Sequence, residues 1–185
     1  MKTEQKPDIF LAVVDTYKGL IYKIANSYCI NPESRKDLVQ EIIVQLWKSF
    51  DRYDSQYKQS TWIYRISLNV AISFYRKETR RKEISNPHSD SILSLADAGT
   101  PPETETDLGL LQQFISELKE LDKALMLLYL DEKSYKEISE IIGITETNVA
   151  TKNPKVVQEM FQIMKNSRVP SDVFTFGSEN VVPKD

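Results

Sequence analysis

Apolar residues recur every three to four positions along most of this chain, which is the spacing of one face of an α-helix. No long run alternates apolar and polar residues, and glycine occupies only 5 of the 185 positions, so the pattern predicts an all-α fold. In the first half of the chain it predicts three helices, at about 8–28, 33–50 and 60–82.

A polar stretch then divides the chain in two. Residues 84–107 combine prolines and a glycine with serines, threonines and acids, which is the composition of a linker. Helical spacing resumes over 108–165, whereas 166–185 lacks it and is expected to be disordered. The sequence therefore predicts two small helical domains, 8–83 and 108–165, joined by a flexible acidic linker.

The second domain carries a helix-turn-helix signature. Ser134 and Glu137 have the spacing of a capping box at the start of a helix. Gly143 suits the left-handed residue that ends such a helix, and Thr145 can cap the next one. This second helix would present polar side chains that can reach base edges and phosphates, namely Thr147, Asn148, Thr151 and Lys152. The alternative interpretation is an ordinary helical hairpin within a bundle.

The charge distribution agrees with nucleic-acid binding, although the net charge of -3 does not. Between positions 52 and 82 only Asp54 and Glu78 are acidic, whereas eight residues are basic: Arg52, Lys58, Arg65, Arg76, Lys77, Arg80, Arg81 and Lys82. Residues 84–107 contain acids but no lysine or arginine. This arrangement predicts a phosphate-facing surface followed by a linker that does not bind DNA.

Several other functions are disfavoured by composition. The single cysteine, Cys29, excludes an internal disulfide and suits a reducing cytoplasm. No stretch is apolar enough to insert into a membrane, and the N-terminus lacks the apolar core of a signal peptide. The only histidine, His88, has no partner with metal-ligand spacing, and the glycines are isolated. We therefore expect a cytoplasmic protein with no metal, no cofactor and no catalytic site.

Three motifs, in this order, resemble those of the extracytoplasmic-function (ECF) sigma factors of bacterial RNA polymerase. The segment 37–41 (DLVQE), followed by Leu46-Trp47-Lys48, is similar to their core-binding helix. The segment 61–71 (TWIYRISLNVA), which leads to Tyr75-Arg76-Lys77, is similar to their promoter-melting helix. The helix-turn-helix beyond an acidic linker completes the pattern, so the resemblance covers roughly residues 8–152.

The resemblance implies a function and a set of site residues. It implies a protein that binds core RNA polymerase, recognises two promoter elements, helps to open the duplex and is held by an anti-sigma partner. It implies polymerase contacts by Asp37, Leu38, Gln40 and Glu41. It also implies DNA contacts by Tyr64, Arg65, Asn69, Arg76 and Lys77 in the first domain, and by Thr147, Asn148, Thr151 and Lys152 in the second.

Each of these sets also has a plainer interpretation. A charged stripe such as the one from Asp37 to Glu41 is more often a solvated helix face. The basic run from Arg76 to Lys82 also suits the end of a solvated helix, where the helix dipole favours cations. Trp62, which begins the melting motif, is better read as a core residue.

The sequence departs from this family after Lys152, where Asn153-Pro154 replaces an aliphatic residue and a basic run. Proline inside a helix removes a hydrogen bond and clashes with the preceding turn, at a cost of roughly 3 kcal/mol. We therefore expect the recognition helix to stop near Lys152 and a new helix to begin, capped by Asn153. Natural divergence and a reading-frame change both remain open as origins, and both predict weakened binding of the upstream promoter element.

Two alternatives belong to other functional classes. A stand-alone helix-turn-helix regulator would bind duplex DNA without polymerase, usually as a dimer on paired half-sites. A helical adaptor whose DNA-binding end is interrupted by Pro154 would bind protein only. The basic run and the aromatic loop before Trp62 favour the sigma factor, because a duplex regulator has no use for a strand-melting surface.

Overall fold

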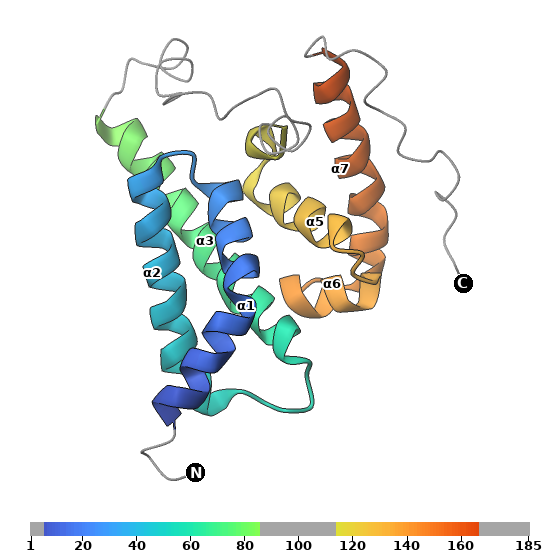
Figure 1. Cartoon of the computed structure of the whole chain (residues 1–185). Helices are drawn as coiled ribbons and strands as arrows, with labels where there is room; N and C mark the ends of the chain where they lie inside the picture. The colour runs from blue at the N-terminus through green and yellow to red at the C-terminus, as the bar shows by residue number, and fades with distance from the viewer. Residues whose placement is uncertain (1–5, 86–113, 167–185) are drawn as a thin grey trace.

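Figure 1 shows the computed structural model of the chain, which describes residues 6–85 and 114–166. Within these ranges the regular structure is entirely helical, and the all-α prediction is confirmed. The elements are α1 (Lys6–Tyr28), α2 (Pro32–Ser49), the 3-10 turn η2 (Phe50–Arg52), α3 (Gln59–Ser85), α5 (Glu120–Leu130), α6 (Tyr135–Ile142) and α7 (Glu146–Asn166). Most of the predicted linker, and the predicted tail after position 166, lie outside the described residues.

Helices α1, α2 and α3 form the first domain, and each packs against the other two. Their apolar faces meet in a core that includes Ile21, Ile24, Leu38, Ile42, Leu46, Ile63 and Leu68. The Asn31 side chain starts α2 by accepting hydrogen bonds from the backbone N–H groups of Glu33 and Ser34, at 2.8 and 3.1 Å. Pro32 occupies the first turn, where it removes no intrahelical bond.

An aromatic cluster closes the end of this domain where α2 leads into η2. Phe10 meets Trp47 and Phe50 edge-on, with ring centroids 5.0 and 5.3 Å apart. Trp62 lies against Phe50 and Tyr53, at 6.2 and 5.2 Å. Trp62 is thus a half-buried packing residue, in agreement with its interpretation as core.

Helices α5, α6 and α7 form the second domain. Its interior is made by α5 and by the inward residues of the other two helices: Leu125, Met126, Leu128, Ile138, Ile141, Val149 and Val156. Residues 114–117 are also helical, and Phe114 and Ile115 are buried. The two domains share one continuous apolar cluster, because α5 and α6 both pack against α3.

The prediction that the recognition helix stops near Lys152 is wrong. Helix α7 continues through Pro154 to Asn166, so Asn153 does not cap a new helix. Val149 and Val156, on either side of the proline, are 0% and 3% exposed and belong to the apolar core, and α7 packs against both α5 and α6. Burying such a side chain contributes roughly 1.5–3 kcal/mol, so two of them offset the roughly 3 kcal/mol that an internal proline costs.

Candidate polymerase and nucleic-acid interfaces

The predicted polymerase-binding motif lies on the outward face of α2. Asp37, Gln40 and Glu41 are all exposed and fall within one helical turn of each other, so they form a continuous polar stripe. The Glu41 carboxylate accepts a hydrogen bond of 2.7 Å from the Gln45 amide, one turn further on. This stripe offers two carboxylates and an amide to any partner that approaches α2.

Leu38 belongs to the other face of the same helix. It is 0% exposed and packs in the core with Ile42 and Leu46. The structure therefore places Leu38 behind the stripe, where it sets the position of α2 and offers no surface to a partner.

The predicted DNA-binding residues of α3 differ in whether their side chains are free to meet a ligand. Arg65, Asn69 and Lys77 are exposed. Arg76 is also largely exposed, but its Nε donates a 2.9 Å hydrogen bond to the Glu120 carboxylate at the start of α5. Backbone hydrogen bonding at Glu120, and secondarily the guanidinium of Arg76, hold the pKa of this carboxyl below its usual value. Arg76 is thus engaged by the second domain.

Tyr64 differs from the rest of the group, because only 5% of its surface is exposed. Its hydroxyl donates to the carboxylate of Asp131, which also accepts from the Lys23 ammonium. Burial, and secondarily this hydrogen bond, raise the pKa of Tyr64 far above the ordinary value for a phenol. The sequence did not single out Asp131 or Lys23, because both pairings are long-range. Asp131 lies 67 positions from Tyr64 along the chain, and Lys23 lies 108 positions from Asp131.

The helix-turn-helix has the predicted geometry at each of its caps. The Ser134 hydroxyl accepts from the Glu137 backbone N–H at 3.2 Å, and the Glu137 carboxylate accepts from the Ser134 backbone N–H at 3.1 Å. Gly143 ends α6 in the left-handed region, with φ of +79°. The Thr145 hydroxyl accepts from the Asn148 backbone N–H at 3.2 Å and so caps α7.

A second ion pair reaches the capping box from the first domain. Lys58 donates a 2.9 Å hydrogen bond to the Glu137 carboxylate. That bond is the main reason why the pKa of Glu137 falls to about 2, and the Ser134 backbone N–H adds to the effect. Glu137 therefore holds the first turn of α6 and also ties it to the loop before α3.

The candidate recognition face of α7 is open to solvent. Its four predicted contact residues, Thr147, Asn148, Thr151 and Lys152, are all exposed. The Thr151 hydroxyl donates to the Thr147 carbonyl at 2.9 Å, and its oxygen keeps lone pairs that can still accept a hydrogen bond. The face therefore offers an amide, two hydroxyls and an ammonium, which are groups that bind base edges and phosphates.

The turn between α5 and α6 was not predicted. Asp131 caps α5, and Glu132 follows in the left-handed region with φ of +53°. Glu132 and Lys133 donate their backbone N–H groups to the carbonyls of Tyr129 and Leu128, at 2.9 and 3.1 Å, which is the Schellman pattern. Sequence reasoning missed it because glycine, the usual signal for this turn, is absent.

Across residues 6–85 and 114–166, no cluster of three or more His, Cys, Asp or Glu side chains could hold a metal ion. Within the same ranges, no helix combines the length and the apolar character needed to cross a membrane.

Comparison with known proteins places both domains in one class. The family Sigma-70 region 2 matches residues 13–81, and the family Sigma-70, region 4 matches residues 108–152. The chain is 31% identical over 155 residues to the ECF RNA polymerase sigma factor SigW of Bacillus subtilis (strain 168), covering 78% of this chain and 83% of that protein. It is 28% identical over 137 residues to SigM of the same organism, covering 74% and 83%.

Two solved structures share the fold. One is CnrH in complex with the cytosolic domain of CnrY, with a TM-score of 0.60 and 16% identity over 85% of this chain and 88% of that one. The other is the sigma factor RpoE in complex with the anti-sigma factor NepR from Bartonella quintana, with a TM-score of 0.62 and 18% identity over 88% and 98%.

A region 2 domain followed by a region 4 helix-turn-helix defines the sigma-70 class of transcription initiation factors. Within that class, this chain belongs to the ECF sigma factors. It directs core RNA polymerase to specific promoters, and sigma factors as a class are regulatory initiation factors.

Proposed function

We propose that this ECF sigma factor binds core polymerase through the polar stripe of α2 formed by Asp37, Gln40 and Glu41. The exposure of all three residues on one helical face supports the proposal. Carboxylates and an amide so arranged suit a basic partner surface, because charge-assisted hydrogen bonds to arginine would use both acids. Leu38 contributes from within the core by holding α2 in place.

Co-purification with core RNA polymerase tests this assignment. The double charge reversal Asp37→Lys and Glu41→Lys should weaken binding by roughly tenfold or more, because it sets cations against a basic surface. A matched control reverses two exposed acids elsewhere, Asp15→Lys and Glu159→Lys, with the same change in net charge. Equal loss in both double variants would contradict the assignment of this stripe.

The promoter is contacted at two places. The upstream element is bound by the exposed face of α7, and the observation that supports this most strongly is the fully capped turn that presents it. The downstream, melted element is bound by α3 through Arg65, Asn69 and Lys77, with Tyr64 and Arg76 joining when they are released from the second domain. Cationic and aromatic side chains of this kind hold single strands by phosphate contact and stacking.

The proline-containing end of α7 bears on the upstream contact. Because α7 continues past Pro154, the four recognition residues stay within the first two turns of an uninterrupted helix. The proposed recognition face can be tested by measuring the affinity of the holoenzyme for promoter DNA. The variant is Asn148→Ala, and Lys155→Ala serves as an exposed control on the same helix. A loss confined to Asn148→Ala is expected, and an equal effect of both would contradict the proposed face.

The remaining parts of the proposal concern partners and location. The structure of RpoE contains an anti-sigma factor, and that of CnrH contains the cytosolic domain of CnrY. We infer that an anti-sigma partner also binds and restrains this chain. The protein acts in the cytoplasm, where polymerase is found, and requires no metal or cofactor of its own. A stand-alone regulator or an adaptor has less support, because neither accounts for a region 2 domain.

A further inference from the structure

Pro154 lies on the outward face of α7. Among the side chains of α7 that the structure describes, the buried ones are Val149, Asn153 and Val156, which are 0%, 1% and 3% exposed. Opposite them lie exposed residues at helical spacing, which therefore share one face: Thr147, Ala150, Thr151 and Pro154. The two threonines belong to the face proposed to bind the upstream promoter element. Pro154 extends that face by one helical turn.

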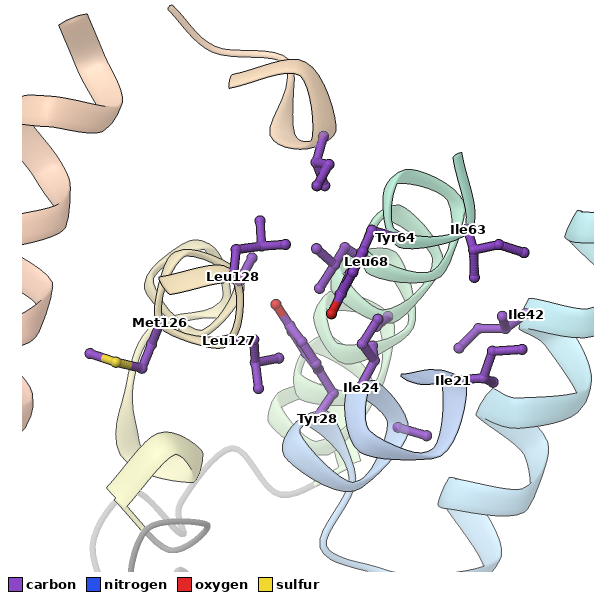
Figure 2. Close-up of a cluster of buried hydrophobic side chains, with 14 of the residues drawn as sticks. Ile21, Ile24, Tyr28, Ile42, Ile63, Tyr64, Leu68, Met126, Leu127 and Leu128 are labelled. Carbon is purple, nitrogen blue, oxygen red and sulfur yellow. The ribbon is translucent and has the colours of Figure 1, made fainter. Parts of the chain in front are cut away.

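The core fixes which side of α7 faces outward. Helix α7 packs against α5 and α6, and Figure 1 shows both of them on the same side of it. Figure 2 shows Met126 of α5, which is 0% exposed, directed away from Tyr28 and Tyr64, on the side of α5 that faces α7. Turning Pro154 inward would bring Val149 and Val156 out of the core. The outward position of Pro154 is therefore set by burial on the other side of the helix.

The exposed ring of Pro154 offers an apolar surface and no polar group. Proline has no side-chain charge and no backbone N–H, so it cannot donate to a phosphate oxygen. The residues one turn before it are also partly apolar. The hydroxyl proton of Thr151 is donated to the Thr147 carbonyl at 2.9 Å, and the side chain of Ala150 is a methyl group. This end of the face therefore presents mainly hydrocarbon.

Only one base has an apolar group in the major groove. Every base pair displays hydrogen-bond donors and acceptors there, and thymine alone adds a methyl group, at C5. Apolar side chains recognise this methyl group by direct contact. The polar edges of guanine and cytosine would instead lose water to an apolar ring without gaining a hydrogen bond. An apolar ring on a recognition face thus favours thymine.

We propose that Pro154 is a specificity-determining residue of the recognition helix: its ring packs against the C5 methyl group of a thymine in the upstream promoter element. The proposal rests on the proposed role of the α7 face in binding that element. Because alanine suits a helix interior better than proline, helix stability gives no reason for a proline at this position, whereas base contact does.

The probe is duplex promoter DNA, selected by the holoenzyme of core RNA polymerase and the full chain from a library randomised across the upstream element. Each thymine of a selected duplex is replaced in turn by deoxyuridine, which removes only the C5 methyl group. The affinity of the holoenzyme is then measured for each substituted duplex. We expect one position at which the wild type binds deoxyuridine about fourfold more weakly than thymine, the factor for returning one buried methyl group to water.

Two variants at this position separate the apolar surface from the shape of the helix. Pro154→Ala removes the ring and should bind the thymine and deoxyuridine duplexes equally at the sensitive position. Pro154→Val also restores the backbone N–H but keeps a branched apolar side chain, so it should retain most of the fourfold preference. Thermal unfolding establishes that both variants fold. The ratio of the two affinities is independent of the amount of active protein.

The proposal is overturned if no thymine shows a methyl dependence that Pro154→Ala removes. It is also overturned if Pro154→Val loses the preference as completely as Pro154→Ala, because helix shape would then be the cause. The selection and Asn148→Ala show whether the α7 face is wrong as well. If a defined upstream sequence is enriched and Asn148→Ala weakens its binding, only the role of Pro154 fails. If no sequence is enriched, or if Asn148→Ala has no effect, the proposed upstream contact fails too.

Discussion

The two domains of this protein achieve their folds by different means. The first is built from helices of 23, 18 and 27 residues, whose long apolar faces pack against one another. In the second, α5 and α6 have only 11 and 8 residues. Helices shorter than roughly 12–15 residues are marginal on their own. The second domain therefore depends more on its caps and turns, which also set the angle of the recognition helix.

This difference determines where a substitution matters. In the first domain the polar stripe of α2 is held in position by the core beneath it, so core volume is the sensitive quantity. In the second domain single residues at helix ends, such as Ser134, Glu132 and Gly143, position the DNA-reading face. The comparison predicts large effects from core deletions in the first domain and smaller, separate effects from caps in the second.

The largest effect is expected for Ile42→Ala. Ile42 is 0% exposed beneath the α2 stripe, and such a deletion typically costs about 2–5 kcal/mol. Urea unfolding measures the loss, with Val44→Ala on the exposed side of α2 as the control, expected to change stability by less than about 0.5 kcal/mol. Similar values for the two variants would break the claim that core volume holds α2.

The next largest effect is a gain in folding stability, which we expect for Pro154→Ala. Alanine would restore the N–H donor in the middle of α7 and remove the ring clash, and should stabilise the protein by up to about 3 kcal/mol. Thermal unfolding and far-ultraviolet circular dichroism measure the change. A loss of stability would show that the proline is matched to its surroundings and that burial of Val149 and Val156 does not explain the continuous helix.

The capping box should have a smaller and pH-dependent effect. Ser134→Ala removes a side-chain cap and should cost about 1 kcal/mol of folding stability.

The pKa of Glu137 is lowered from 4.5 to about 2 by Lys58 and Ser134, so the stability that Glu137 contributes is complete above pH 4.5 and is lost as pH falls toward 2. Glu137→Gln should remove this part of the acid dependence. If the stability of Glu137→Gln fell between pH 4.5 and 2 as steeply as that of the wild type, the acid dependence could not be assigned to Glu137.

The smallest effect is expected at the turn between α5 and α6. Glu132 has φ of +53°, which costs an L-residue roughly 1–2 kcal/mol. Glu132→Gly relieves that strain but adds backbone entropy to the unfolded chain, so we expect a net gain of about 0.5–1 kcal/mol. Glu132→Ala, which keeps the strain, is the control and should not gain. Chemical unfolding of the pair measures the difference.

Much of the fold could be predicted from local sequence. The helices of the first domain begin and end within a few residues of the expected positions, because helical spacing and the Asn31-Pro32 start are short-range signals. The capping box, the left-handed glycine and the Thr145 cap of the helix-turn-helix are also local, and all three were found where predicted.

The parts that could not be predicted depend on distant residues. The cost of Pro154 is visible in the sequence, but the burial of Val149 and Val156 in the core that offsets it is not. The exposed polymerase stripe followed from spacing, whereas the pairing of Tyr64 with Asp131 joins two domains that the sequence treats as separate. Tertiary packing outweighed local propensity in the first case, and in the second no local pattern exists to read.

The most direct test of the central claim is a transcription assay with purified core polymerase, this protein and fragmented genomic DNA from its own source. Sequencing of the RNA 5′ ends should give discrete start sites that share two upstream elements, and these should be absent with core alone or with the Asp37→Lys, Glu41→Lys variant. Transcripts indistinguishable from those of core polymerase alone would contradict the account.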